Sequence, residues 1–513
     1  MTVNVYADEL RRMSTLKRTE NGAVAYNTTG CPTLDLFATI GGMRYGDGSM
    51  ERLSRMIYAA CLQDPLATAR MLFYARDVRG GLGEREVFRK ALFLCAKSHQ
   101  EIIAPNLRLI PEYGRWDDLL SLIGTPLEGR MWGLIKEQLA RDSEAAEKGE
   151  GGVSLLAKWM PSADTSSKDT RKVAFYCADR LGMSVYSYKR YIRAIRRHLD
   201  LLETKMSAGK WSEIDYETVP SQAHMRHIAA FKRNDAERYS DYLSRVESGE
   251  AGMRTGTLYP YEIIERLDNM VVTGQYDQAL ELMWRNLPDY VGNGGNVMVI
   301  ADTSGSMEGR PIAVAVSLAL YFAERNSGPF GGMYMTFSGH PRMIAIDSNQ
   351  SLAQRLADVK NGPWGQNTDL NAALSLMLDT AIRTQASQED MPRSLVIITD
   401  MEIDQCQYGG AEEWSALVDI IDQRYRDSDY RMPNLVFWNV ASRHDTFLAM
   451  GGYKGVQMVS GSSAAVFEKV MGFLDCITPR EAMMQVLGAE RYSPITVDVR
   501  PRIGSKADKE ASR

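Results

Sequence analysis

The stretch VMVIADTSGSMEG, residues 297–309, decides the fold of the C-terminal part of this chain. An apolar run leads directly into Asp302, and Ser304 and Ser306 follow at once. A short apolar run that ends in small polar residues is typical of a buried strand reaching the edge of a parallel sheet. The two serines alternate with other residues, so both hydroxyl groups can face one point beside the carboxylate.

After about residue 290 the sequence alternates between short apolar runs and helical segments. The runs are VMVIA, MYMTF, MIAI, SLVIIT, LVFWNV and VQMV. Strands that alternate with helices predict a parallel, doubly wound, Rossmann-like sheet that is covered on both faces. The turn NGGN at 293–296 marks the boundary. We therefore expect an α/β domain over residues 291–475, followed by a C-terminal extension and mobile tail over 476–513.

Two further polar residues fall where they can join this strand end. Thr368 precedes a predicted helix in NTDL, and Asp400 ends the strand SLVIITD. Mg²⁺ prefers oxygen ligands in an octahedral arrangement and keeps some of its water. We therefore predict a site for Mg²⁺, or another divalent cation such as Mn²⁺, at Asp302, Ser304, Ser306, Thr368 and Asp400. The alternative is an ordinary turn or helix cap, which also favours Asp and Ser.

Residues 1–290 have a different pattern of apolar residues. Segments such as MERLSRMIYAACLQD and REVFRKALFLCAKSH repeat apolar residues at helical spacing, and Gly and Pro separate them at short intervals. No strand pattern is evident, which predicts an α-helical repeat or solenoid domain. Within it, ARDVRGGLGERE (75–86) has two interpretations. It is a turn between helices with ion-paired arginines, or a glycine-rich phosphate cradle with Arg76, Arg79 and Arg85.

The segment YSYKRYIRAIRRHL, residues 186–199, is strongly basic. Residues 151–200 contain ten Lys and Arg but four Asp and Glu, although the whole chain has a net charge of −5. Cations with interleaved tyrosines favour contact with nucleic acid, and the alternative is a solvated basic face. The candidate RNA-binding residues are Lys168, Arg171, Lys172, Lys189, Arg190, Arg193, Arg196 and Arg197.

The bulk composition excludes several classes of protein. No run approaches 18 apolar residues, which argues against a transmembrane helix, and the first residues lack the apolar core of a secretory signal. Six cysteines are scattered without metal-binding spacing, which is typical of reduced thiols in a cytoplasmic protein. No nucleophile stands beside a base in the predicted site, so we do not expect an enzyme.

The five predicted ion ligands match the metal-ion-dependent adhesion site of the von Willebrand factor A (VWA) domain, which residues 291–475 resemble. The resemblance implies that the serines and the threonine bind the ion nearly directly, while the aspartates act through water. It also implies that an acidic group of a protein partner completes the coordination.

The first part of the chain resembles the TROVE domain of the Ro family. The resemblance rests on ARDVRGGLGERE, GRWDDLL, KWSEIDYETVPS and LYPYEII, followed by the VWA-like domain. Through AKWMPS and KWSEIDYETVPS it is greatest to a Ro-like family with a C-terminal VWA domain. It implies a ring of HEAT-like helices that the VWA domain closes, with RNA ends in the ring and small structured RNAs outside.

We therefore expect a non-enzymatic RNA-binding protein of ribonucleoprotein type. Its partners would be small non-coding or misfolded RNAs with single-stranded ends, with no membrane partner. The alternative is a metal-dependent protein-interaction scaffold with no role in RNA binding.

Overall fold

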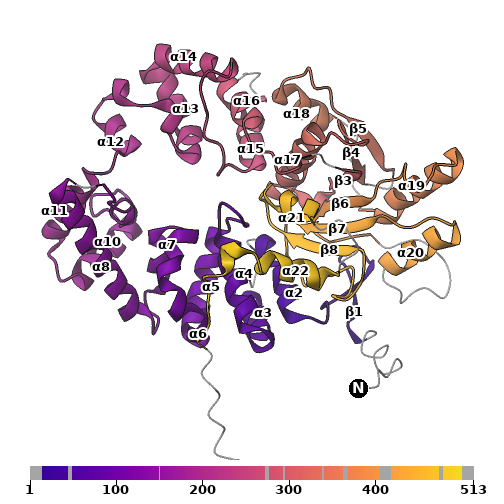
Figure 1. Cartoon of the computed structure of the whole chain (residues 1–513), viewed down its shortest axis with the longest axis horizontal. Helices are drawn as coiled ribbons and strands as arrows, with labels where there is room; N and C mark the ends of the chain where they lie inside the picture. The colour runs from indigo at the N-terminus through magenta and orange to yellow at the C-terminus, as the bar shows by residue number, and fades with distance from the viewer. Residues whose placement is uncertain are drawn as a thin grey trace, which may run out of the picture.

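An arc of helices forms the first part of the structure, and an α/β domain forms the second (Figure 1). This arrangement confirms the predicted fold class. The computed structural model describes residues 14–43, 49–149, 151–271, 277–292, 295–337, 340–361, 368–404, 417–472 and 478–498. Residues 293 and 294 of the predicted boundary turn and the predicted tail over 499–513 lie outside the described residues.

A small hairpin precedes the helices. Strands β1 (Leu16–Arg18) and β2 (Val24–Tyr26) pair antiparallel, and Tyr26 exchanges two backbone hydrogen bonds with Phe447 of the α/β domain, at 2.8 and 3.0 Å. The expectation of an all-helical first part is wrong here. A strand of three residues is too short to show the alternation that marks a strand in sequence.

Short helices follow one another around the arc, and neighbours such as α3 and α4, α10 and α11, and α13 and α14 pack together. Among the described residues, no helix is both long and apolar enough to cross a membrane. The helices are α2 (Pro32–Phe37), α3 (Ser49–Gln63), α4 (Pro65–Arg76), α5 (Arg85–Ser98), α6 (Gln100–Ile103), α7 (Ile110–Tyr113), α8 (Glu128–Lys148), α9 (Leu156–Trp159), α10 (Lys168–Arg180), α11 (Val185–Arg196), α12 (Leu202–Ser207), α13 (Ser221–Asn234), α14 (Ala236–Glu247), α15 (Pro260–Val271) and α16 (Gln278–Arg285).

The sheet of the α/β domain contains all six predicted strands in the order β5-β4-β3-β6-β7-β8. They are β3 (Val297–Asp302), β4 (Met333–Phe337), β5 (Arg342–Ala345), β6 (Ser394–Thr399), β7 (Asn434–Asn439) and β8 (Val456–Ser460). The edge strand β5 runs antiparallel to β4, so the expected purely parallel sheet is wrong at this edge. The strand order reverses between β3 and β6, which is where ligands bind in doubly wound sheets.

Helices cover both faces of the sheet, as predicted. Alternate residues of β3 point to opposite faces, so Val299 packs with one core and Ile300 with the other. The first core is continuous with that of the helical arc and includes α17 (Arg310–Arg325), α18 (Leu352–Asn361) and α21 (Val466–Gly472). The second core includes α19 (Leu370–Thr384) and α20 (Leu417–Asp427).

The helical arc returns to the α/β domain at both of its ends, so the chain closes into a ring (Figure 1). At one end, α2 and α4 contact α22 (Pro479–Leu487), and α2 also contacts β8. At the other end, α15 and α16 contact α17 and α18. The α/β domain therefore joins the first helices to the last ones.

The glycine-rich stretch 75–86 is a turn between α4 and α5 at the centre of this closure. The Tyr259 hydroxyl, from the segment before α15, donates to the Leu82 carbonyl at 3.3 Å. Gly83 has φ +66°, and a Cβ there would lie 1.6 Å from the Tyr259 oxygen. Arg76 is buried and pairs with Asp118 at 2.7 Å. These contacts favour the interhelical turn over the phosphate cradle.

The C-terminal extension is part of the closure. Arg491, in the turn after α22, donates to the buried carboxylate of Asp77 at 2.7 Å, and the Tyr492 hydroxyl donates to the same carboxylate at 3.2 Å. Further along, the Thr496 amide donates to the Asn106 side chain at 3.0 Å. Residues 478–498 therefore pack on the first helices.

Replacing Arg491 with alanine should lower the midpoint of thermal unfolding. Asp77 is fully buried, so its carboxylate would lose its cationic partner. Removing one partner of a buried ion pair lowers the free energy of unfolding by about 3 kcal/mol at the lower end of the usual range. We expect this lower value because the Arg491 side chain is 34% exposed. Arg480→Ala, on the exposed side of α22, is the control. Equal midpoints for the two variants would contradict this role of Asp77.

Candidate functional site

Two acidic side chains meet at the point where the strand order reverses. Asp302 is the last residue of β3, and Asp400 directly follows β6. These strands are parallel neighbours, with Ala301 opposite Ile398, so their carboxyl ends reach the same edge of the sheet. The topology therefore brings the two predicted aspartates together.

The Asp302 carboxylate is buried and its hydrogen bonds orient it. It accepts from the Ser304 amide at 2.9 Å and from the Thr399 hydroxyl at 2.6 Å. Burial and the nearby charge of Asp400 raise the pKa of Asp302 to about 7, and these hydrogen bonds oppose the rise. Burial also raises the pKa of Asp400, while Ser306 and Arg443 lower it. The pair would gain from a nearby cation.

Three hydroxyl groups lie on the segments around the pair. Ser304 directly precedes a short 3₁₀ turn, η6 (Gly305–Met307), and its hydroxyl oxygen lies 3.0 Å from the hydroxyl oxygen of Ser306. Thr368 is held from both sides by Asp404, whose carboxylate accepts from the Thr368 amide and whose amide donates to the Thr368 carbonyl. These contacts fix the backbone and leave the threonine hydroxyl available.

Two buried oxygen atoms of this set have no hydrogen-bond partner in the described part of the chain. They are the Thr368 hydroxyl and one carboxylate oxygen of Asp400. Buried polar atoms are nearly always satisfied, so two such atoms, one directly after β6 and one just before α19, point to a missing partner. The described residues contain no group of three or more His, Cys, Asp or Glu suited to a metal. Hydroxyl and carboxylate oxygens are the ligands that a hard divalent cation prefers.

Sequence reasoning missed two residues at this site. Met401, directly after Asp400, has φ +73°, a backbone conformation uncommon for a residue with a side chain. Arg443 follows β7, and its guanidinium lies 3.7 Å from the Asp400 carboxylate and donates to the Ser306 carbonyl. No motif marks Arg443, because its place depends on the order of strands in the sheet.

The predicted basic residues lie on α10 and α11, which pack together. Lys168, Lys172, Arg190, Arg193 and Arg197 are exposed, while Arg171 and Lys189 are half-buried. Three of the cations have an acidic neighbour. Lys189 and Arg193 both pair with Asp164. Lys172 lies 3.8 Å from Asp169.

Arg196 does not belong to this exposed surface. Its guanidinium donates to the carbonyl groups of Ala157 and Met160, at 2.7 and 2.8 Å. It therefore ties α11 to the end of α9, and its hydrogen-bonding groups are occupied within the chain, whereas RNA binding by Arg196 stays a prediction. Helical spacing alone placed it on the same side as Arg193.

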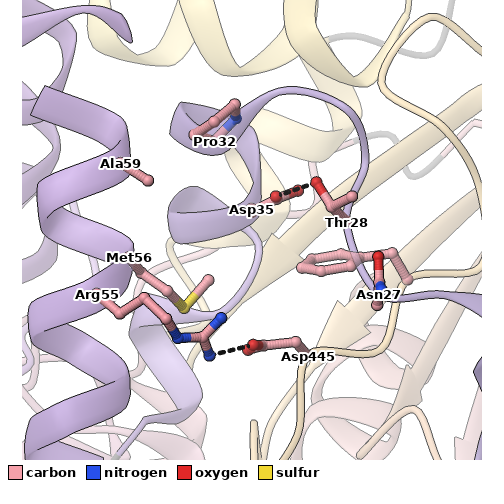
Figure 2. Close-up of a pocket in the computed structure, with 9 residues that line it drawn as sticks. Asn27, Thr28, Pro32, Asp35, Arg55, Met56, Ala59 and Asp445 are labelled. Carbon is pink, nitrogen blue, oxygen red and sulfur yellow. Dashed lines mark hydrogen bonds and ion pairs between the residues drawn. The ribbon is translucent and has the colours of Figure 1, made fainter. Parts of the chain in front are cut away.

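A cavity of about 360 Å³ lies elsewhere, where α2 and α3 meet the α/β domain (Figure 2). Its charged groups already have partners within the chain. Asp35 accepts from Thr28 at 2.5 Å, and Arg55 donates to Asp445 at 2.5 Å (Figure 2). We assign this cavity to the ring closure and not to the ion site.

Two family profiles match the chain, and both describe domains of unknown function. The profile "Domain of unknown function (DUF2828)" matches residues 19–136 and 178–296, and "Domain of unknown function (DUF7788)" matches residues 296–493. The profiles meet next to the first strand of the α/β domain. Helix α11 lies within the first profile, whereas α10 begins in the stretch between its two matched parts.

A viral protein is similar along nearly the whole chain. "Uncharacterized protein L728" of Acanthamoeba polyphaga mimivirus is 26% identical over 544 residues, which cover 97% of this chain and 92% of that protein. Among solved structures, the RO (RSR) protein of Deinococcus radiodurans is 14% identical, with a TM-score of 0.38. The match covers 90% of this chain and 100% of that one.

Asp302→Asn should raise the thermal stability of the chain without the ion and lower it, relative to the native chain, with the ion. In a chelator at pH 7.5 the variant should unfold at a higher temperature, because it removes a buried charge that Asp400 repels. With Mg²⁺ at about a hundred times its Kd, the free energy of unfolding of the native chain should rise by about 2.7 kcal/mol. That of the variant should change little. Asp390→Asn, an exposed change, is the control for thermal unfolding. An unchanged Mg²⁺ shift in Asp302→Asn would contradict the site.

The Mg²⁺ shift should also grow between pH 6 and pH 8. The folded pKa of Asp302, about 7, lies above the value of about 3.9 for an unfolded chain. The contribution of the Asp302 proton to folding stability is therefore fully present below pH 4 and is lost as the pH rises through 7. The ion must displace that proton, so binding strengthens as the pH rises. Thermal unfolding at a series of pH values measures this, and a constant shift would refute it.

Proposed function

We propose that this chain is a non-enzymatic RNA-binding protein with a divalent-ion site in a VWA-like domain. RNA contacts the exposed surface of α10 and α11, and the ion site binds an acidic group of a ligand. The Ro-like resemblance of the sequence supports the same assignment. Small non-coding or misfolded RNAs with single-stranded ends are the proposed partners.

The observation that carries this proposal is the presence of exposed aromatic rings among exposed cations. Phe175 of α10 is 49% exposed and Tyr186 of α11 is 69% exposed. Large aromatic side chains are usually buried, and exposed rings beside cations are the groups on which bases of single-stranded RNA stack. The Arg190 guanidinium lies over the Tyr186 ring, 5.7 Å from its centre.

The opposing interpretation is a basic face neutralised by the chain itself. It accounts for Lys189 and Arg193, which pair with Asp164, and for Lys172, which pairs with Asp169. It does not account for the aromatic rings. It also leaves Lys168, Arg190 and Arg197, for which the described residues show no ion pair. The surface therefore keeps positive charge that phosphates can neutralise.

Changing Arg190, Arg193 and Arg197 together to Gln should weaken the binding of RNA to the same extent whatever the RNA sequence. Each phosphate contact on single-stranded RNA contributes about 0.7 to the slope of log affinity against log salt. Removing three contacts should therefore flatten that slope by about 2. The measurement is a titration of a labelled single-stranded RNA at several salt concentrations.

A matched control removes the same charge elsewhere. Arg383 in α19, Arg426 in α20 and Arg431 are exposed on the α/β domain, and Figure 1 shows α19 and α20 on the far side of the molecule from α11. Their change to Gln should leave the slope as it is. If both triple variants give the same slope of log affinity against log salt, the cations of α10 and α11 face solvent and do not contact RNA.

A second function is ion-dependent binding of a protein partner. It is favoured by two buried oxygen atoms, of Thr368 and Asp400, that have no hydrogen-bond partner in the described part of the chain. In such a complex an acidic side chain of the partner would complete the ion's coordination. Proteins captured by the native chain should then be released by a chelator and should fail to bind Asp302→Asn. Capture that is unaffected by both treatments would exclude this function.

A further inference from the structure

We propose that the ion site receives a phosphate group at the end of an RNA chain, and that Arg443 is the residue that selects phosphate. The inference rests on the proposed function, because it names the part of the RNA that reaches this site. It depends on the geometry of Arg443, which no motif in the sequence marks.

Arg443 lies at the rim of the site. Its guanidinium is 3.7 Å from the Asp400 carboxylate and donates to the carbonyl of Ser306, whose hydroxyl is a predicted ligand. The side chain is 30% exposed, so Arg443 is not enclosed by the protein. A ligand bound to the ion beside Ser306 would lie within reach of it.

The backbone that carries Arg443 is held by the helical arc. The Ser442 amide donates to the Gly42 carbonyl at 3.1 Å, and Arg52 of α3 donates to the Ser442 carbonyl at 2.6 Å. Arg52 also donates to the Asp445 carboxylate at 2.6 Å. These contacts on both sides fix the position of the backbone, so that the guanidinium is pre-positioned for a ligand.

Charge and shape favour phosphate over carboxylate. A divalent ion and one guanidinium place three positive charges beside Asp302, Asp400 and, next to Thr368, Asp404. A terminal phosphate, with a charge of about −1.5 to −2 at neutral pH, gains more from these cations than a carboxylate does. Mg²⁺ in proteins commonly combines one or two carboxylates with phosphate oxygens, and the arginine fork matches phosphate geometry. A phosphate has enough oxygens to contact the ion and both guanidinium nitrogens at once, whereas a carboxylate has two.

The depth of the site favours an end of the RNA over its internal linkages. Asp302 and Thr368 are fully buried, and Ser304 is 3% exposed, so the ion would lie below the surface. An internal phosphodiester is flanked by sugars on both sides and has a single charge, while a terminal phosphate can enter with one attachment. Without the ion, Asp302 and Asp400 would repel any phosphate, so binding requires the ion.

The experiment compares three RNAs of one sequence, carrying a 5′ phosphate, a 3′ phosphate or hydroxyl groups at both ends. With Mg²⁺, the native chain should bind at least one phosphorylated RNA about tenfold more tightly than the hydroxyl form, as a charge-assisted contact provides. EDTA should remove this preference, and so should Arg443→Gln. The matched control is Arg342→Gln, an exposed change on the edge strand β5, which removes the same charge and should keep the preference.

The Mg²⁺-induced shift in thermal unfolding provides the second readout. Arg443→Gln should retain that shift, because it removes a cation that competes for Asp400. Loss of the shift would mean that Arg443 only supports the ion site, and would overturn the inference. Equal binding of all three RNAs by the native chain would also overturn it while leaving RNA binding intact. An ion-dependent preference for a phosphorylated peptide over every RNA would overturn it as well. Failure of every RNA to bind would instead reject the proposed function.

Discussion

The structure depends on the buried carboxylate of Asp77, at the end of α4. A charge without exposure to water is tolerated in a protein only with a partner, and Arg491 and Tyr492 provide it from the end of the chain. If the C-terminal segment left the first helices, the Asp77 carboxylate would therefore become exposed or would stay buried without a partner. The same turn contacts Tyr259, so one small region joins the start of the arc, its end and the C-terminal segment.

The N-terminal part of the chain also holds the loops that carry the proposed ion ligands. The N-terminal hairpin reaches the segment after β6, where the Glu20 amide donates to the Glu402 carboxylate and the Asn21 side chain donates to the Glu402 carbonyl. Glu402 lies two residues after Asp400. Arg52 of α3 similarly holds the segment that carries Arg443. The hairpin and helix α3 thus each hold one of the two loops beside the site.

Much of this could be predicted from the sequence, for physical reasons. The central strands of the α/β domain are buried on both faces and so appear as continuous apolar runs, as VMVIA and SLVIIT do. The juxtaposition of Asp302 and Asp400 follows from parallel strands that end at one edge. The basic helix around Arg193 is evident from its composition.

The rest depends on contacts between residues far apart in the chain. The hairpin strands are too short to give a pattern, and their pairing with Phe447 is long-range. Arg196 has the same spacing as its exposed neighbours, but the turn after α9 presents carbonyl groups to it. Arg443 reaches the site only because β7 lies next to β6. Helical spacing and composition contain no information on such contacts.

The packing of residues 478–498 on α4 has a consequence for biosynthesis. A chain emerges from the ribosome from its N-terminus, and its early domains usually fold as they appear. Here α4 exposes Asp77 and its surrounding surface until Arg491 and Tyr492 have been made, more than four hundred residues later in the sequence. The contacts of α4 with residues 478–498, which complete the closure, can therefore form only after the α/β domain has been translated.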